Sequence, residues 1–106
     1  MKYIRYIEMM KTDYNSPSRY LSSGSNKPVI NNITWYLVQE SYLQNALVGG
    51  LLPNLEQTYY WTGFSGKRGF WMFFTTIFYY MHKTTGVKDD TSDSGKLYGI
   101  RLGRGI

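Results

Sequence analysis

The sequence predicts a mainly α protein with one transmembrane helix over about residues 61–83, an amphipathic helix over about 33–48, and extended polar arms. The first observation is the segment Gly69–Met81, which contains no charged residue and no proline. The second is that lysine and arginine residues border this segment on both sides. The third is an aromatic content of 18 %, which is typical of membrane interfaces and of protein contact surfaces.

The length of the charge-free run decides how it could cross a bilayer. Residues 69–82 span about 21 Å as a helix, less than the roughly 30 Å of the hydrocarbon core. Flanking lysine and arginine side chains lengthen the span, because their aliphatic stems let the charge reach the headgroups. The expected lipid and interface contacts are Trp61, Lys67, Arg68, Trp71, Tyr79, Tyr80, His82 and Lys83. The alternative is a buried helix or strand pair in a soluble domain.

The chain divides into an N-terminal arm, two helical segments and a C-terminal arm. Residues 1–32 are the N-terminal arm, in which residues 1–11 fit either a short amphipathic helix or a frayed terminus. The rest of this arm is rich in serine and interrupted by proline and glycine, which predicts a loop. Residues 33–58 contain the amphipathic helix and a turn, with Gly49-Gly50 ending the helix. Residues 59–83 form the aromatic-rich membrane helix.

Residues 84–106 are a polar C-terminal arm. Its first half has almost no apolar side chain, whereas Leu97–Ile106 recovers apolar residues between glycines and arginines. Glycines let a backbone approach a neighbour closely, and arginine pairs well with carboxylates. We therefore expect a partner protein to order this tail through Tyr98, Ile100, Arg101, Leu102 and Arg104.

No set of residues for catalysis, cofactor binding or metal binding can be assembled from the sequence. The chain has no cysteine and one histidine, His82, so cysteine-based metal and nucleophile sites are excluded. Glu40 and Glu56 are the acids of the middle segment, and nothing in the sequence sets a distance between them. The stretch Gly63–Gly69 contains a GxxG pattern beside two cations, but it departs from the order of a P-loop.

The block Gly66–Lys83, GKRGFWMFFTTIFYYMHK, resembles the membrane stalks of small single-span accessory subunits of mitochondrial respiratory complexes. It is most similar to the small B-type subunits of complex I, which have a basic entry, a short aromatic span and a histidine or lysine at the exit. The resemblance covers about 18 of the 106 residues and lies in residue type rather than in a specific motif. It implies an inner-membrane structural subunit without redox centres.

The expected function is a non-catalytic accessory subunit of a multi-subunit membrane complex in the mitochondrial inner membrane. Its partners would be membrane lipids and the other subunits of that complex, and it would need no cofactor. The alternative is a small basic mitoribosomal protein, because the net charge of +5 gathers at the two ends of the chain, where extended arms could contact RNA. A small soluble enzyme is a third reading, with no residues to support its chemistry.

Overall fold

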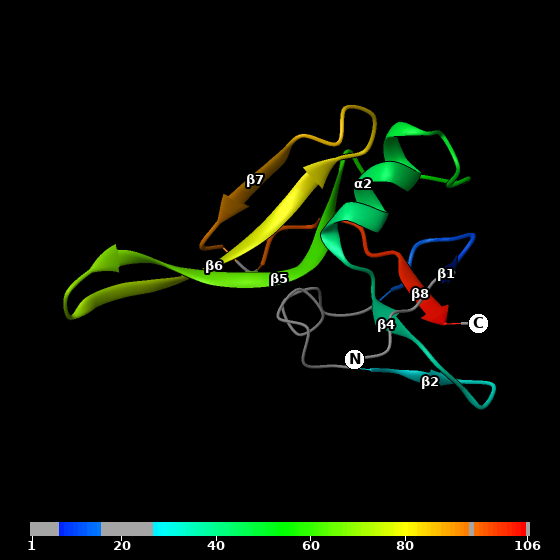
Figure 1. Ribbon diagram of the computed structural model, residues 1–106, viewed down its shortest axis with the longest axis horizontal. Helices are drawn as coiled ribbons and strands as arrows, with labels where there is room; N and C mark the ends of the chain where they lie inside the picture. The colour runs from blue at the N-terminus through cyan, green and yellow to red at the C-terminus, as the bar shows by residue number, and fades with distance from the viewer. Residues whose placement is uncertain (1–6, 16–26, 94, 106) are drawn as a thin grey trace.

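The computed structural model describes residues 7–15, 27–93 and 95–105, and in these ranges the protein is mainly β. The strands are β1 (Ile7–Met9), β2 (Val29–Ile30), β3 (Ile33–Thr34), β4 (Tyr36–Leu37), β5 (Tyr59–Phe70), β6 (Phe73–His82), β7 (Lys88–Thr91) and β8 (Leu102–Gly105). The helix α2 covers Glu40–Val48. Figure 1 shows a body that holds α2 and the short strands, from which β5 and β6 extend as a long hairpin.

The predicted mainly α fold with a transmembrane helix over 61–83 is wrong. This stretch forms two antiparallel strands, β5 and β6, joined by a two-residue turn at Trp71-Met72. Aromatic and β-branched residues dominate the stretch, and these residue types pack well on a pleated sheet. In the part of the chain that the structure describes, no helix is long and apolar enough to cross a membrane. The predicted transmembrane helix is therefore corrected to a β-hairpin.

The β5–β6 hairpin has two regions separated by a bulge. Near the body, Tyr59–Trp61 pairs with Tyr80–His82, and β7 covers the other side of β6 from Phe78 to Met81. The register then shifts between Trp61 and Ser65, where the Thr62 hydroxyl donates a hydrogen bond to the Tyr79 carbonyl. Beyond the bulge, β5 and β6 pair regularly to the turn. We call this outer region, residues 65–77, the arm.

The amphipathic helix predicted over 33–48 is present only in its second half. Its first half folds as β3 and β4, and β2 and β3 form a hairpin with Asn31 and Asn32 at φ of 52° and 65°. Positive φ at both central residues is the requirement of a type I′ turn, which asparagine tolerates well. Leu43, Ala46 and Leu47 form the buried side of α2.

Two clusters of buried side chains form the core of the body. One lies beneath α2 and contains Val38, Leu43, Ala46, Leu47, Leu52, Tyr60 and Met81. The other contains Trp61, Ile100 and Leu102, with half-buried rings around them. Tyr60 and Trp61 are neighbours on β5 that point to opposite faces, so this one strand joins the two clusters.

The two ends of the described chain meet in a three-stranded sheet. β8 lies in the middle, paired with β1 on one side and β4 on the other. Arg101, which precedes β8, is buried, and its Nε donates to the Asp13 carboxylate at 2.9 Å. The Tyr60 hydroxyl donates to the same carboxylate at 2.9 Å. This polar cluster therefore connects the N-terminal segment, β5 and the C-terminal segment.

Candidate functional site

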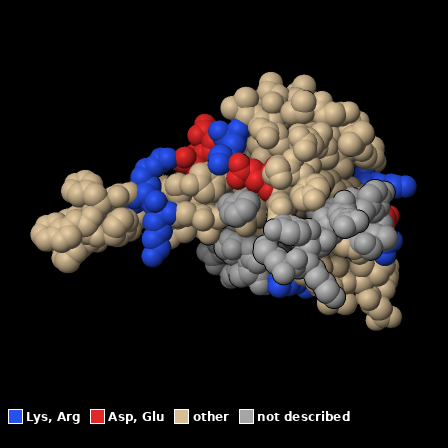
Figure 2. All heavy atoms as spheres, viewed as in Figure 1, with Lys and Arg blue, Asp and Glu red and all other residues tan. Residues whose placement is uncertain are grey.

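The outer end of the arm exposes a continuous run of large apolar side chains. The exposed fractions of Phe70, Trp71, Met72, Phe73 and Phe74 lie between 56 % and 78 %. Single exposed apolar residues are ordinary, but a contiguous cluster marks an interaction site. We call these five residues the tip. In Figure 2 it is the uncharged extremity that projects from the body.

The turn that displays the tip contains an unfavourable backbone conformation. Trp71 has a φ of 57°, in the left-handed region, and it occupies the first central position of a two-residue turn. Glycine is preferred where this position has a positive φ, and a bulky residue there is a genuine outlier. Such strain clusters at functional sites, where the side chain is needed for something other than folding. The conformation therefore points to a role for the exposed indole ring.

Two cations stand behind the tip on β5. Lys67 and Arg68 are both exposed, and together they form the blue band across the arm in Figure 2. Arg68 donates to the Asp90 carboxylate on β7 at 2.5 Å, although its side chain remains 65 % exposed. An exposed ion pair of this kind contributes about 0–1 kcal/mol to the stability of the fold.

The arm has open backbone edges. β7 pairs with β6 only at residues 78–81, and no described strand continues it along residues 73–77. The outer edge of β5 is likewise unpaired from Ser65 to Phe70 among the residues that the structure describes. A hollow of about 320 Å³ lies beside β6 just beyond the end of β7, lined by Arg68, Gly69, Phe73, Thr75, Ile77 and Ser92.

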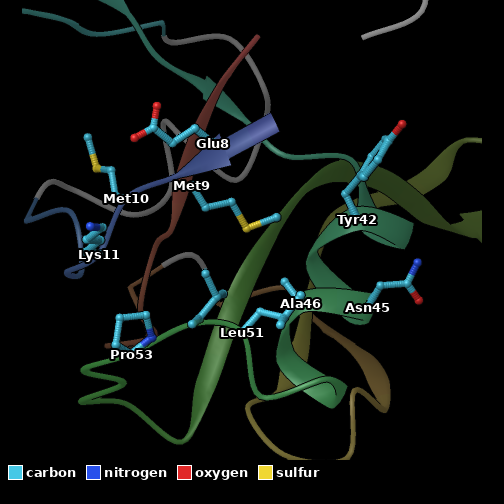
Figure 3. A pocket seen from close by; sticks show the side chains of 10 residues that line it. Glu8, Met9, Met10, Lys11, Tyr42, Asn45, Ala46, Leu51 and Pro53 are labelled. Carbon is cyan, nitrogen blue, oxygen red and sulfur yellow. The ribbon is translucent and has the colours of Figure 1, made fainter. Parts of the chain in front are cut away.

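A second hollow lies on the body, between the β1 segment and α2. It has a volume of about 510 Å³, and Met9, Met10, Ala46, Leu51, Leu52 and Pro53 form most of its wall. Figure 3 shows Met9 extended across the space towards Ala46 and α2. The polar residues at this hollow are Glu8, Lys11, Tyr42 and Asn45. These side chains can hold an apolar group, but they include neither a histidine nor a pair of carboxylates for acid–base chemistry.

The predicted lipid-contact residues separate into an exposed and a packed group. Lys67, Arg68 and Trp71 lie on the arm, whereas Trp61 is 1 % exposed and lies in the core. Tyr79, Tyr80, His82 and Lys83 are half-buried on β6 and the turn after it. The His82 Nδ1 accepts hydrogen bonds from the backbone N–H groups of Thr84 and Thr85, so this histidine stabilises the turn before β7.

Tyr80 belongs to an aromatic cluster at the base of the hairpin. Its ring lies 4.5 Å from that of Tyr98 and 5.2 Å from that of Tyr59, measured between centroids. Burial, followed by the hydrogen bond with Tyr98, raises the pKa of Tyr80 to about 12. Trp61 packs against this cluster, and its Nε1 has no hydrogen-bond partner in the described part of the chain.

The predicted partner-contact residues of the tail lie within the fold. Tyr98 belongs to the aromatic cluster, and Ile100, Arg101 and Leu102 are buried. Arg104 pairs with Glu8 on the neighbouring β1, at 2.6 Å. The chain itself therefore supplies the contacts that order this tail up to Gly105. In the described ranges, no group of three or more histidine or acidic residues could hold a metal ion.

Comparison of the chain with protein-family models, with curated proteins and with solved structures finds no match. No relative identifies it as a subunit of a respiratory complex.

Sequence reasoning missed Phe70, Met72, Phe73 and Phe74 as site residues, because it placed them inside a span. A signal was present: Lys67 and Arg68 directly precede a short run with strand-forming residues at both ends. The turn itself, Trp71-Met72, contains neither glycine nor asparagine, which are the residues that usually indicate a two-residue hairpin turn.

Proposed function

We propose that this chain is a non-catalytic structural protein that joins a larger protein assembly through the arm. The observation that carries the proposal is the tip, five consecutive large apolar residues held 56–78 % exposed. In water this cluster is costly, at roughly 25 cal/mol per Å² of apolar surface, and a partner that covers it recovers that free energy. Aromatic residues and methionine are enriched at protein interfaces, and arginine at their borders fits the same pattern.

The distribution of charge supports protein contact better than the RNA-binding alternative. Arg68, Lys88, Arg101 and Arg104 each pair with a carboxylate of the chain itself. Phosphate contacts need cations that are free and gathered on one surface. The tip itself carries no cation at all.

The test compares tagged variants of the full chain in the cells that make it. Trp71→Gly removes the exposed indole ring while supplying the residue that the turn prefers, so the fold is retained. Leu97→Ser is the matched control, because Leu97 is 87 % exposed and lies outside the arm. Each variant is extracted under native conditions, and the size of the particle that contains it is measured by size-exclusion chromatography.

We expect the wild type and Leu97→Ser to elute as one larger particle, and Trp71→Gly to elute at a smaller size. If Trp71→Gly elutes with the wild type, the tip is not a docking element and the proposal fails. If the wild type itself elutes as a lone chain in native extract, the structural role in an assembly is refuted as well.

A further inference from the structure

We propose that the tip of one copy of this chain docks into the hollow between β1 and α2 of a second copy, so that copies join head to tail. We call this space the body hollow; its wall is formed mostly by Met9, Met10, Ala46, Leu51, Leu52 and Pro53. The inference rests on the proposed function, since it names the partner that covers the tip. The tip and the body hollow complement each other in position, chemistry and size.

The tip and the body hollow lie towards opposite ends of the molecule. In Figure 1 the turn between β5 and β6 lies at one end of the longest dimension, 42 Å, whereas β1 and the loop after α2 lie towards the other end. A chain therefore cannot place its own tip in its own body hollow. An apolar projection at one end and an apolar recess at the other suit a contact between successive copies.

The body hollow presents an apolar wall that suits aromatic rings. Figure 3 shows Met9 extended across the space towards Ala46, with the Glu8 carboxylate pointing away from Ala46. Leu51 lines the hollow and is 73 % exposed, so this part of the wall is accessible from solvent. Methionine adapts its shape to its neighbours, and its sulfur makes favourable contacts with aromatic rings. Met9 and Met10 are therefore suited to the aromatic side chains of the tip.

The two surfaces are large enough for a stable contact. A buried aromatic side chain removes roughly 150–250 Å² from water, so five large residues with exposed fractions of 56–78 % present roughly 500–900 Å². A specific interface buries about 800 Å² on each partner. The body hollow has a volume of about 510 Å³, within the roughly 300–1,000 Å³ of sites that enclose a drug-sized group. Trp71 and Met72 enter it, and the three phenylalanines of the tip cover its mouth.

The arm keeps the bodies of two docked copies apart. From Gly66 to Phe70 it extends four residue steps, about 14 Å at 3.4 Å per residue. β7 ends at Thr91, which pairs with Phe78 behind the arm, so no described strand other than β5 and β6 lies beside the turn. The tip can therefore enter the body hollow of a second copy without displacing a described strand of either chain.

Each copy offers one tip and one body hollow, so the contact is heterologous. Such a contact repeats from copy to copy until a ring closes, or it continues as a filament. The two surfaces can be inactivated separately: Trp71→Gly removes the indole ring from the tip, and Leu51→Lys places a cation in the body hollow. A mixture of these two variants retains a single contact, between the tip of Leu51→Lys and the body hollow of Trp71→Gly.

The test measures the mass of purified chains by sedimentation velocity, and circular dichroism establishes that each variant is folded. Leu51→Lys should keep the fold because its side chain is largely exposed. Leu97→Lys is the matched control, since it introduces the same residue at a leucine that is 87 % exposed and lies outside both surfaces. Asn45→Lys repeats the test at a second exposed position of the body hollow. Trp71→Gly and Leu51→Lys are measured alone and as an equimolar mixture.

We expect the wild type and Leu97→Lys to form particles of more than two chains at micromolar concentrations. Trp71→Gly, Leu51→Lys and Asn45→Lys should each sediment as a single chain. The mixture of Trp71→Gly with Leu51→Lys should give a particle of twice the mass of one chain and nothing larger. A monomeric wild type, assembly of both body-hollow variants as in the wild type, or a mixture that stays monomeric overturns the inference.

Elution in native extract separates this inference from the proposed function. If Leu51→Lys elutes with the wild type while Trp71→Gly elutes at a smaller size, the tip docks to a different protein. The inference then fails and the proposed function stands. If Trp71→Gly elutes with the wild type, both fail.

Discussion

Replacing Arg101 by methionine should remove a large fraction of the free energy of unfolding. The side chain of Arg101 is fully buried, and besides Asp13 it donates to three backbone carbonyl groups. These belong to Met10 at 3.1 Å, Pro53 at 2.6 Å and Asn54 at 2.8 Å. One guanidinium thus holds the N-terminal segment and the loop after α2 against the strand that ends the described chain.

The magnitude follows from what the substitution leaves behind. Methionine fills a similar space, so the main loss is a buried carboxylate without its cation, together with carbonyl groups without donors. Breaking a buried ion pair at one partner costs about 3–5 kcal/mol. A chain of 106 residues has a free energy of unfolding of about 5–16 kcal/mol, so the change removes a large fraction of it.

The assay is urea unfolding at pH 7, followed by circular dichroism. Arg104→Met is the control, because Arg104 is half-exposed and its pair with Glu8 contributes only about 0–1 kcal/mol. We expect a much lower midpoint for Arg101→Met, with the control near the wild type. If Arg101→Met unfolds within about 1 kcal/mol of the wild type, the buried cluster does not hold the two ends together.

Three further predictions concern the core, the aromatic cluster and the turn. Gly99→Ala should cost about 1–3 kcal/mol in the same assay, because its Cβ would clash with the Tyr60 ring. Since the pKa of Tyr80 rises from 10.0 to about 12 on folding, its stabilisation should be complete below pH 10 and be lost as the pH approaches 12. Between pH 10 and 12 the free energy of unfolding should therefore fall less in Tyr80→Phe than in the wild type. An equal fall in both proteins would refute the raised pKa of Tyr80. Trp71→Gly should keep the wild-type stability or raise it by up to about 1 kcal/mol, while a clear decrease would show that the turn is unstrained.

The sequence located the apolar segment correctly but assigned it the wrong secondary structure. Gly69–Met81 is uncharged, so it lacks the polar face that distinguishes a helix from a strand by period. Its aromatic, threonine and isoleucine content favours a strand, and this weaker signal agrees with the secondary structure that the segment adopts. The turn at Trp71-Met72 could not be predicted, since it relies on a residue that the conformation disfavours.

The placement of the tail depends on contacts that are distant in sequence. Met9 pairs with Gly103, and Arg101 bonds to Asp13, across most of the length of the chain. No local sequence pattern predicts such pairing. The glycines and arginines of the C-terminal segment were therefore interpreted as contacts to a partner protein, although they pack against the chain's own core. By contrast, the end of α2 at Gly49-Gly50 is a local feature, with Gly50 at a φ of 67°, and sequence reasoning placed it correctly.

Shortening the arm tests the central claim most directly. Residues 67–76 are replaced by Asn-Gly, which joins Gly66 to Ile77, two residues already paired in register, by a favoured two-residue turn. The body keeps its core clusters, so we expect its thermal unfolding to stay cooperative. In native extract the shortened chain should elute alone, without the larger particle of the wild type. If it folds and still elutes in that particle, the arm is not what joins this protein to its assembly.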